Sequence, residues 1–133
     1  MEKVYRSFYT KSDFITDYMV KMLDLKDNDL VLEPSGGDGV FIDSLLNTNK
    51  ALQIETCDIN EKAVKILQNK YKNKDNIKIW ETDTLLDETF DEYAENNGYY
   101  DKIIGNPPYG GWQDFQKRDL LKKKYNGHYV KET

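Results

Sequence analysis

Four short strand-like runs, each followed by polar residues, constrain the fold of this chain most. The runs are Leu30–Leu32, Leu52–Cys57, Ile77–Thr82 and Tyr99–Ile104, and helix-like or irregular stretches lie between them. Strands that alternate with helices in this way are typical of βαβ units, which form parallel sheets with right-handed crossovers. We therefore predict an α/β fold with one parallel sheet and flanking helices.

The residues that follow the four runs predict where a ligand binds. Glu33 opens a glycine-rich loop after the first run, and Asp58, Asp83 and Asn106 follow the other three. The carboxyl ends of parallel strands meet at one edge of the sheet, where ligands bind in such folds. All four predicted strands end in this way, so we expect the site at that edge.

The connecting segments contain the predicted helices. Apolar residues recur at helical spacing in residues 7–23, in residues 40–46 and after Asn60. Asn60 is the expected N-cap of the third helix. Residues 85–97 are acidic and weakly periodic, which indicates an irregular helix and loop. The buried stripe of the third helix should consist of Ala63, Val64, Ile66 and Leu67.

Length and charge limit the classes of function. A chain of 133 residues suits a single hydrophobic core. Its net charge of −5 argues against nucleic-acid binding by this segment alone, because phosphate binding needs clustered Lys and Arg. Basic residues are concentrated only at Lys117-Arg118 and Lys122–Lys124, where a solvated helix face is favoured over a phosphate-binding edge.

Other sequence features indicate a cytoplasmic protein without a metal site. No apolar stretch is long enough to span a bilayer, and residues 1–6 lack the apolar core of a signal peptide. The single cysteine, Cys57, is expected to be a small buried strand residue. His128 has no partner at metal-ligand spacing, so we expect it at the surface.

The glycine-rich loop is compatible with a dinucleotide or with a cationic ligand. Starting from Gly37-Asp38-Gly39, the third glycine of a dinucleotide motif would fall at position 42, which is Ile42. Glu33 and Asp38 would also repel a pyrophosphate. S-adenosylmethionine fits better, because it carries a sulfonium and an α-ammonium together with a ribose diol and an adenine.

Three residues after the strands suit particular groups of that cofactor. Asp58 is expected to accept hydrogen bonds from both ribose hydroxyls, and Asp83 from the adenine amine. Ile59 is expected to cover one face of the adenine. Each residue also has a purely structural interpretation, with the carboxylates serving strand-to-helix turns and the glycines a tight turn.

Several motifs together resemble one enzyme family. Glu33–Phe41 (EPSGGDGVF), Asp58, Asp83 and Asn106–Tyr109 (NPPY) are similar to class I S-adenosylmethionine-dependent methyltransferases. More narrowly, they resemble the N6-adenine DNA methyltransferases of restriction-modification systems. Phe8–Thr10 is similar to the N-terminal cofactor motif of that family, and this order of motifs is the gamma arrangement.

The resemblance implies a Rossmann-like fold and a set of cofactor contacts. Two departures from the family pattern are Lys11, where a proline is usual, and Ser35-Gly36, where a small residue and a cysteine are commoner. The residues implied to bind S-adenosyl-L-methionine are Tyr9, Thr10, Glu33, Pro34, Ser35, Gly36, Gly37, Asp38, Asp58, Ile59, Asp83 and Asn106.

The resemblance also implies that Asn106, Pro107, Pro108 and Tyr109 are catalytic. The Asn106 side-chain oxygen and the Pro107 carbonyl would accept hydrogen bonds from the amine of adenine, and proline fixes the backbone there. Tyr109 would stack on a base that has left its duplex. No metal is required for this transfer.

In the family, further strands and a DNA-reading domain follow the Asn-Pro-Pro-Tyr strand. We therefore expect residues 1–133 to be the cofactor-binding part of a catalytic domain, with the fourth strand as an edge. Residues 1–26 would form the N-terminal motif and helix, and residues 27–133 the βαβ core. DNA would be bound by absent regions, in further C-terminal polypeptide or a partner subunit. The alternatives are an RNA or protein-amide N-methyltransferase, or a non-catalytic cofactor-binding module.

Overall fold

A parallel four-stranded sheet forms the centre of the protein. The computed structural model describes residues 13–106 and 115–125. The strand order is β3-β2-β1-β4, and every neighbouring pair is parallel, as the sequence predicts. The strands are β1 (Leu30–Glu33), β2 (Gln53–Asp58), β3 (Ile77–Glu81) and β4 (Lys102–Ile103).

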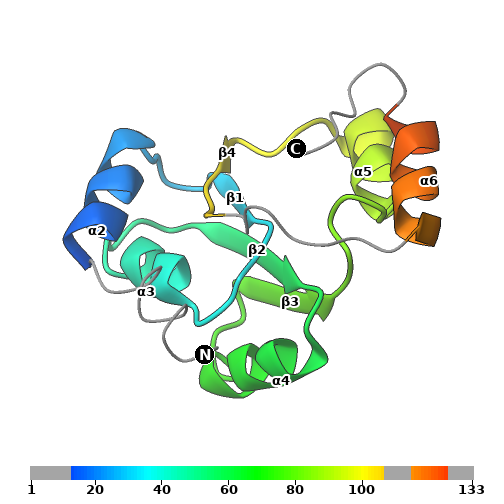
Figure 1. The fold of residues 1–133 in the computed structure, drawn as a ribbon. Helices are drawn as coiled ribbons and strands as arrows, with labels where there is room; N and C mark the ends of the chain where they lie inside the picture. Colours follow the sequence, from blue (N-terminus) through cyan, green and yellow to red (C-terminus); the bar gives the residue numbers. More distant parts are fainter. Residues whose placement is uncertain (1–12, 107–114, 126–133) are drawn as a thin grey trace.

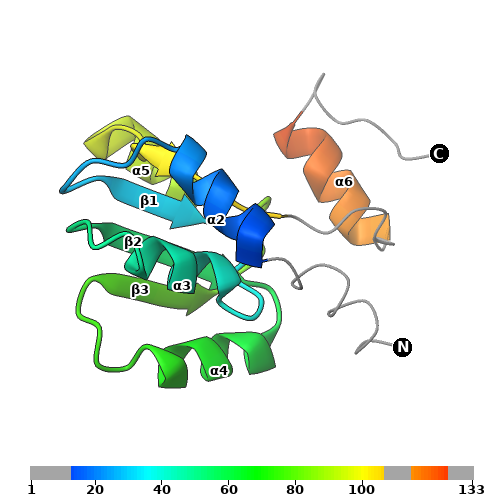
Figure 2. The same cartoon turned by 90° about the vertical axis from the view of Figure 1, so that its left-hand side faces the viewer.

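Helices cover both faces of the sheet. Figures 1 and 2 show α2, α3 and α4 on one face and α5 on the other. α6 contacts α5 through an ion pair between Lys124 Nζ and Asp91 Oδ2, which are 3.1 Å apart. The helices are α2 (Asp13–Met22), α3 (Val40–Leu46), α4 (Glu61–Lys70), α5 (Thr89–Asn97) and α6 (Phe115–Lys124).

The order of the strands creates a switch point at β1. The chain continues from β1 to β2 and β3 on one side, and then crosses to β4 on the other side. Val31 of β1 pairs with Ile54 of β2 and with Lys102 of β4. In open α/β sheets, ligands bind beyond the strand ends at such a point. The fold therefore favours ligand binding at the edge of the sheet that contains Glu33 and Asn106.

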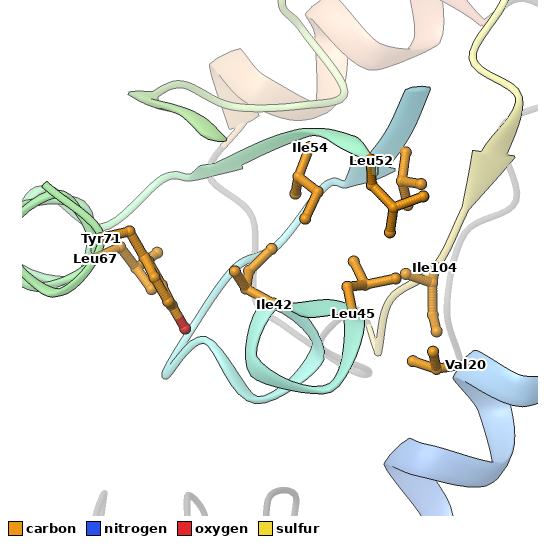
Figure 3. Close-up of a cluster of buried hydrophobic side chains, with 9 residues drawn as sticks. Val20, Ile42, Leu45, Leu52, Ile54, Leu67, Tyr71 and Ile104 are labelled. Carbon is orange, nitrogen blue, oxygen red and sulfur yellow. The ribbon is translucent and has the colours of Figure 1, made fainter. Parts of the chain in front are cut away.

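The main hydrophobic core lies between the sheet and α2, α3 and α4. Figure 3 shows Ile42 and Leu45 of α3 directed toward Leu52 and Ile54, with Val20 and Ile104 at one end of the cluster. The buried members are Val20, Val31, Ile42, Leu45, Leu52, Ile54, Leu67, Tyr71 and Ile104.

α2 packs differently from what its apolar residues suggest. Thr16 and Val20 are its buried residues. Ser44 Oγ of α3 donates a hydrogen bond of 2.6 Å to Asp17 Oδ1, so a polar pair helps to fix which face of α2 meets α3. Large apolar side chains on the other face are consequently exposed, namely Phe14, Ile15, Tyr18 and Met22.

The structure of α4 confirms the predicted N-cap and corrects the predicted set of buried apolar residues. Asn60 Oδ1 accepts hydrogen bonds from the backbone N–H groups of Lys62 and Ala63, at 3.0 and 3.5 Å. Ala63, Val64 and Leu67 are buried as predicted, but Ile66 is 60% exposed. The prediction for Ile66 was wrong because the contact with the sheet is narrower than the apolar pattern of the helix.

β4 is shorter than the predicted strand over residues 99–104. At the start of the ladder the Asp101 N–H donates to the Leu30 carbonyl at 2.9 Å, and the Asp101 Oδ2 accepts a hydrogen bond of 2.7 Å from the Leu30 N–H. At the other end, the Ile104 N–H donates to the Leu32 carbonyl at 3.0 Å. Tyr99 precedes this pairing and is exposed.

Three further expectations concern single features. Cys57 is buried on β2, as predicted. On α6, Lys122 and Lys123 are exposed, which agrees with a solvated helix face, while Lys124 packs against α5. Within residues 13–106 and 115–125, no helix is long and apolar enough to cross a membrane.

Candidate cofactor site at the carboxyl edge of the sheet

The ends of all four strands meet at one edge, as the sequence predicts. The Gly36 N–H donates to the Cys57 carbonyl at 2.8 Å, which joins the loop after β1 to the end of β2. Thr84 Oγ1, beside Asp83, donates to the Pro34 carbonyl at 2.6 Å. Gly105, which follows β4, lies against the Glu33 carboxyl group.

Asp58 is the carboxylate most directly connected to the glycine-rich loop. Its Oδ2 accepts a hydrogen bond of 3.0 Å from the Gly37 N–H. Its Oδ1 accepts one of 2.8 Å from the Asn60 N–H, which is the turn interaction anticipated as a structural alternative. A carboxylate offers about four acceptor positions, so Asp58 retains capacity for ligand hydroxyls.

The glycine-rich loop is anchored on the side of α4. The Tyr71 hydroxyl lies 3.0 Å from the Gly39 carbonyl oxygen and 2.6 Å from Asp43 Oδ1. Lys70 Nζ is paired with Asp43 Oδ2 at 2.7 Å. Gly39 has φ 82°, and a Cβ there would lie 2.5 Å from the Tyr71 hydroxyl oxygen, so the contact requires glycine.

The environment of Tyr71 keeps its hydroxyl protonated. Burial raises the pKa of Tyr71 far above its ordinary value, and the hydrogen bond to the Asp43 carboxylate raises this pKa further. The hydroxyl therefore remains a donor at any physiological pH.

Glu33 lies beneath the loop rather than in the open part of the edge. Its residue exposure is 1%. Oε2 accepts a hydrogen bond of 3.1 Å from Thr56 Oγ1. Burial raises the pKa of the Glu33 carboxyl group to about 7, and the Asp58 carboxylate contributes in the same direction. Hydrogen bonds from Thr56 and the Ser35 backbone act against this rise.

The remaining predicted residues fall at the same edge or outside the described residues. Asp83 Oδ1 accepts a hydrogen bond of 3.1 Å from the Leu85 N–H, which forms a turn. Ile59 is 61% exposed directly after Asp58. Asp38 and Asn106 are also exposed. The predicted residues outside the described ranges are Tyr9, Thr10, Pro107, Pro108 and Tyr109.

The edge offers mainly hydrogen-bond acceptors. Asp58 accepts a hydrogen bond from the Gly37 N–H, Asp38 is an exposed residue of the loop, and Asp83 follows β3. Such a set of carboxylates suits a ligand with cationic groups and hydroxyl donors. Within the described part of the chain, no group of three or more His, Cys, Asp or Glu residues is arranged to hold a metal ion.

Sequence reasoning missed two residues, Thr56 and Tyr71, whose buried side chains support the carboxyl edge of the sheet. Thr56 is the register partner of Glu33 in the β1–β2 ladder, and both side chains are buried. Alternation along the two strands could have indicated this pair once their register was known. Tyr71 gave no comparable signal, because its contact with Gly39 depends on how α4 sits against the loop.

Comparison with known proteins identifies the family. The sequence model of the Eco57I restriction-modification methylases matches residues 5–133. The chain belongs to this family. The resemblance inferred from the motif residues is thereby confirmed at the level of restriction-modification methylases.

Curated relatives of this Eco57I-family chain are much longer proteins. It is 29% identical over 93 residues to the type II methyltransferase M.AccI of Acinetobacter calcoaceticus, covering 70% of this chain and 16% of that protein. It is 28% identical over 116 residues to M.HincII of Haemophilus influenzae, covering 85% of this chain and 19% of that protein. The chain thus spans less than a fifth of their length.

Solved structures confirm the fold of this Eco57I-family chain. TrmN from Thermus thermophilus matches with a TM-score of 0.59 and 17% identity, over 87% of this chain and 33% of that one. The 23S rRNA methyltransferase ErmE matches with a TM-score of 0.57 and 21% identity, over 72% and 36%. At such identities the likeness concerns the fold, which is the Rossmann-like class I methyltransferase fold.

Proposed function

We propose that the carboxyl edge of the sheet binds S-adenosyl-L-methionine and that the protein methylates N6 of adenine in DNA. Membership of the Eco57I family and the naming of both relatives as type II methyltransferases support this proposal. The observation that carries it is the hydrogen bond from the Gly37 N–H to Asp58 Oδ2 between the ends of β1 and β2, at the sheet edge where Asn106 follows β4.

The residues present fit the cofactor. In our proposal Asp58 accepts hydrogen bonds from the ribose hydroxyls, Asp83 accepts one from the adenine amine, and the exposed Ile59 covers one adenine face. The contacts of Tyr9, Thr10 and residues 34–38 would complete the cofactor site. When bound, the cofactor supplies an activated methyl group on a sulfonium.

Residues 106–109 after β4, here called the tip, would bind the amine that receives the methyl group. The amine nitrogen of adenine is a weak nucleophile because its lone pair is delocalised into the ring. Acceptance of its two protons by the Asn106 side-chain oxygen and the Pro107 carbonyl would free that lone pair. Pro108 would keep the tip rigid and Tyr109 would stack on the flipped base, so catalysis would come from positioning and oriented dipoles.

DNA would be held outside this acidic segment. With a net charge of −5, the chain alone offers little attraction for phosphates. We propose that residues 1–133 are the cofactor part of a catalytic domain and that DNA is gripped by further polypeptide or by a partner subunit.

The cofactor site is tested with Asp58→Ala and Asp58→Asn. Both substitutions should weaken binding of S-adenosylhomocysteine in calorimetry by about tenfold or more. Alanine removes both acceptor oxygens, and asparagine removes the charge and one of the two oxygens. Asp75→Ala is the matched control, since Asp75 is exposed and precedes β3, at the opposite end of the sheet. Unchanged affinity in both Asp58 variants would remove Asp58 from the site.

The reaction is tested with Asn106→Ala and radiolabelled cofactor. The substitution should abolish methyl transfer to unmethylated DNA while cofactor affinity stays mostly intact, because Asn106 acts on the target amine. The measurement uses the chain alone and the whole product of its gene. Equal loss of transfer and cofactor affinity would contradict this role, and transfer to RNA or to a protein amide instead of DNA would overturn the proposed substrate.

A further inference from the structure

The Glu33 carboxyl group is seated between two glycines on separate loops. A Cβ on Gly105 would lie 3.1 Å from Glu33 Oε1, and a Cβ on Gly36 would lie 3.5 Å from Oε2. A Cβ on Gly36 would also lie 2.5 Å from Thr56 Oγ1. The absence of side chains lets both loops approach one carboxyl group from two sides.

One oxygen of this carboxyl group has no partner among the described residues. Thr56 Oγ1 donates to Oε2, but Oε1 is buried and receives no hydrogen bond within the described ranges. Most buried polar atoms are paired, so an unpaired carboxyl oxygen at a functional edge calls for a partner. Gly105, whose backbone leads to Asn106, lies against this oxygen.

We propose that Glu33 is a positioning residue, which sets the spacing between the glycine-rich loop and the Gly105–Asn106 backbone through Oε1. Glu33 is 1% exposed, so in this proposal it acts through these two backbone segments, in place of the direct cofactor contact that the resemblance implies. The inference rests on the proposed function, since the two segments are those assigned to the cofactor and to the target amine.

The protonation state of Glu33 should then change the spacing near neutral pH. Burial, followed by the Asp58 carboxylate, raises the pKa of Glu33 to about 7, against the effect of hydrogen bonds from Thr56 and the Ser35 backbone. The titratable groups facing it come from β2 and are Asp58 and Cys57. Protonated Oε1 donates a hydrogen bond, whereas ionised Oε1 only accepts.

The effect of Glu33 on the spacing between the glycine-rich loop and the Gly105–Asn106 backbone is tested by NMR titration of the 133-residue chain between pH 5.5 and 8.5. The Gly105 amide signal should shift with the same midpoint, near pH 7, as the Cδ signal of Glu33 in protein labelled with ¹³C-glutamate. Different midpoints, or a Gly105 signal that does not titrate, would overturn the proposal. This comparison needs no variant, so it decides the question even if Glu33 substitutions impair folding.

Substitution provides a second test with a matched control. Glu33→Gln should abolish the Gly105 titration. Glu55→Gln should preserve it, because Glu55 accepts a hydrogen bond from the Tyr100 hydroxyl at 2.9 Å, on the next strand. Persistence of the Gly105 titration in Glu33→Gln would assign it to another group and contradict the role of Glu33.

Measurements of ligand binding distinguish a failure of this inference from a failure of the proposed function. A cationic ligand favours ionised Glu33, so wild-type protein should release protons on binding S-adenosylmethionine, which carries a sulfonium, at pH 7. Calorimetry in buffers of different ionisation enthalpy measures this release, which Glu33→Gln should lack. Glu33→Gln should bind about threefold to tenfold more weakly at pH 8 and equally at pH 6. Proton release retained by Glu33→Gln contradicts the inference, whereas no binding by wild-type protein contradicts the proposed function alone.

Discussion

At the scale of single residues, Tyr71 shows how the loop is held from the side away from the ligand edge. Its hydroxyl is buried between the Gly39 carbonyl and the Asp43 carboxylate. Lys70 is paired with the same carboxylate, so three side chains support one backbone turn. The shape of the loop therefore depends on groups that would never contact a cofactor.

Tyr71→Phe should loosen the glycine-rich loop. Loss of the hydroxyl removes its contacts with the Gly39 carbonyl and Asp43 Oδ1, although the Asp43 N–H and Lys70 still donate to these two groups. The free energy of unfolding should therefore fall by about 1 kcal/mol in urea denaturation. Affinity for S-adenosylhomocysteine should fall as well, because the loop backbone is less well fixed. Tyr99→Phe is the control, since Tyr99 is 82% exposed and distant from the loop in sequence. Equal effects of both substitutions would exclude this role of Tyr71.

At the scale of elements, α4 offers a direct comparison of two neighbouring apolar residues. Leu67 is fully buried in the core, whereas Ile66 is 60% exposed. Leu67 also lies close to Gly36 and Gly39, so the same side chain supports the core and the loop. The two residues differ in burial far more than in chemistry.

Leu67→Ala should destabilise the protein much more than Ile66→Ala. Removal of a buried leucine leaves a cavity and should cost about 2–5 kcal/mol in the free energy of unfolding. Ile66→Ala should change it by about 0.5 kcal/mol or less, as is usual at the surface. Chemical denaturation measures both values. A similar cost for the two substitutions would mean that Ile66 is buried in solution.

The elements themselves could be predicted from the sequence because apolar runs and polar strand ends alternate sharply. Parallel topology then brought Glu33, Asp58 and Asn106 to one edge without further information. The buried face of α2 could not be predicted, because helical periodicity does not say which of two adjacent faces meets α3. The support from Thr56 and Tyr71 depends on contacts across 23 and 32 residues, which local patterns do not determine.

At the scale of the whole molecule, two carboxyl groups give stability opposite dependences on pH. Burial and then the Asp58 carboxylate raise the pKa of Glu33 from 4.5 to about 7. Between pH 4.5 and about 7 the folded state therefore binds more protons than the unfolded state, and stability decreases as pH rises through this range. Burial acts against ionisation of Asp87, but hydrogen bonds from Thr89, Thr82 and Trp80 lower its pKa from 3.8 to about 2. The stability from Asp87 is lost as pH falls below about 4.

The urea midpoint of the wild-type protein should accordingly be higher at pH 5 than at pH 8. Glu33→Gln should remove most of that difference, because an amide at this position does not titrate. Asp87→Asn should leave it in place and instead reduce the loss of stability between pH 4 and pH 2. A wild-type midpoint that does not change between pH 5 and pH 8 would exclude the raised pKa of Glu33.

The strand order β3-β2-β1-β4 also has a consequence for the course of folding. Glu33 of β1 and Thr56 of β2 are 23 residues apart, whereas Leu30 and Asp101, which join β1 to the start of β4, are 71 apart. Closing a longer loop costs more chain entropy, and contacts between distant residues form more slowly. β1, β2 and β3 can therefore assemble around α3 and α4 before β4 arrives. Asn106 follows β4, so we expect the segment proposed to receive the target amine to be the last part of this edge to take its place.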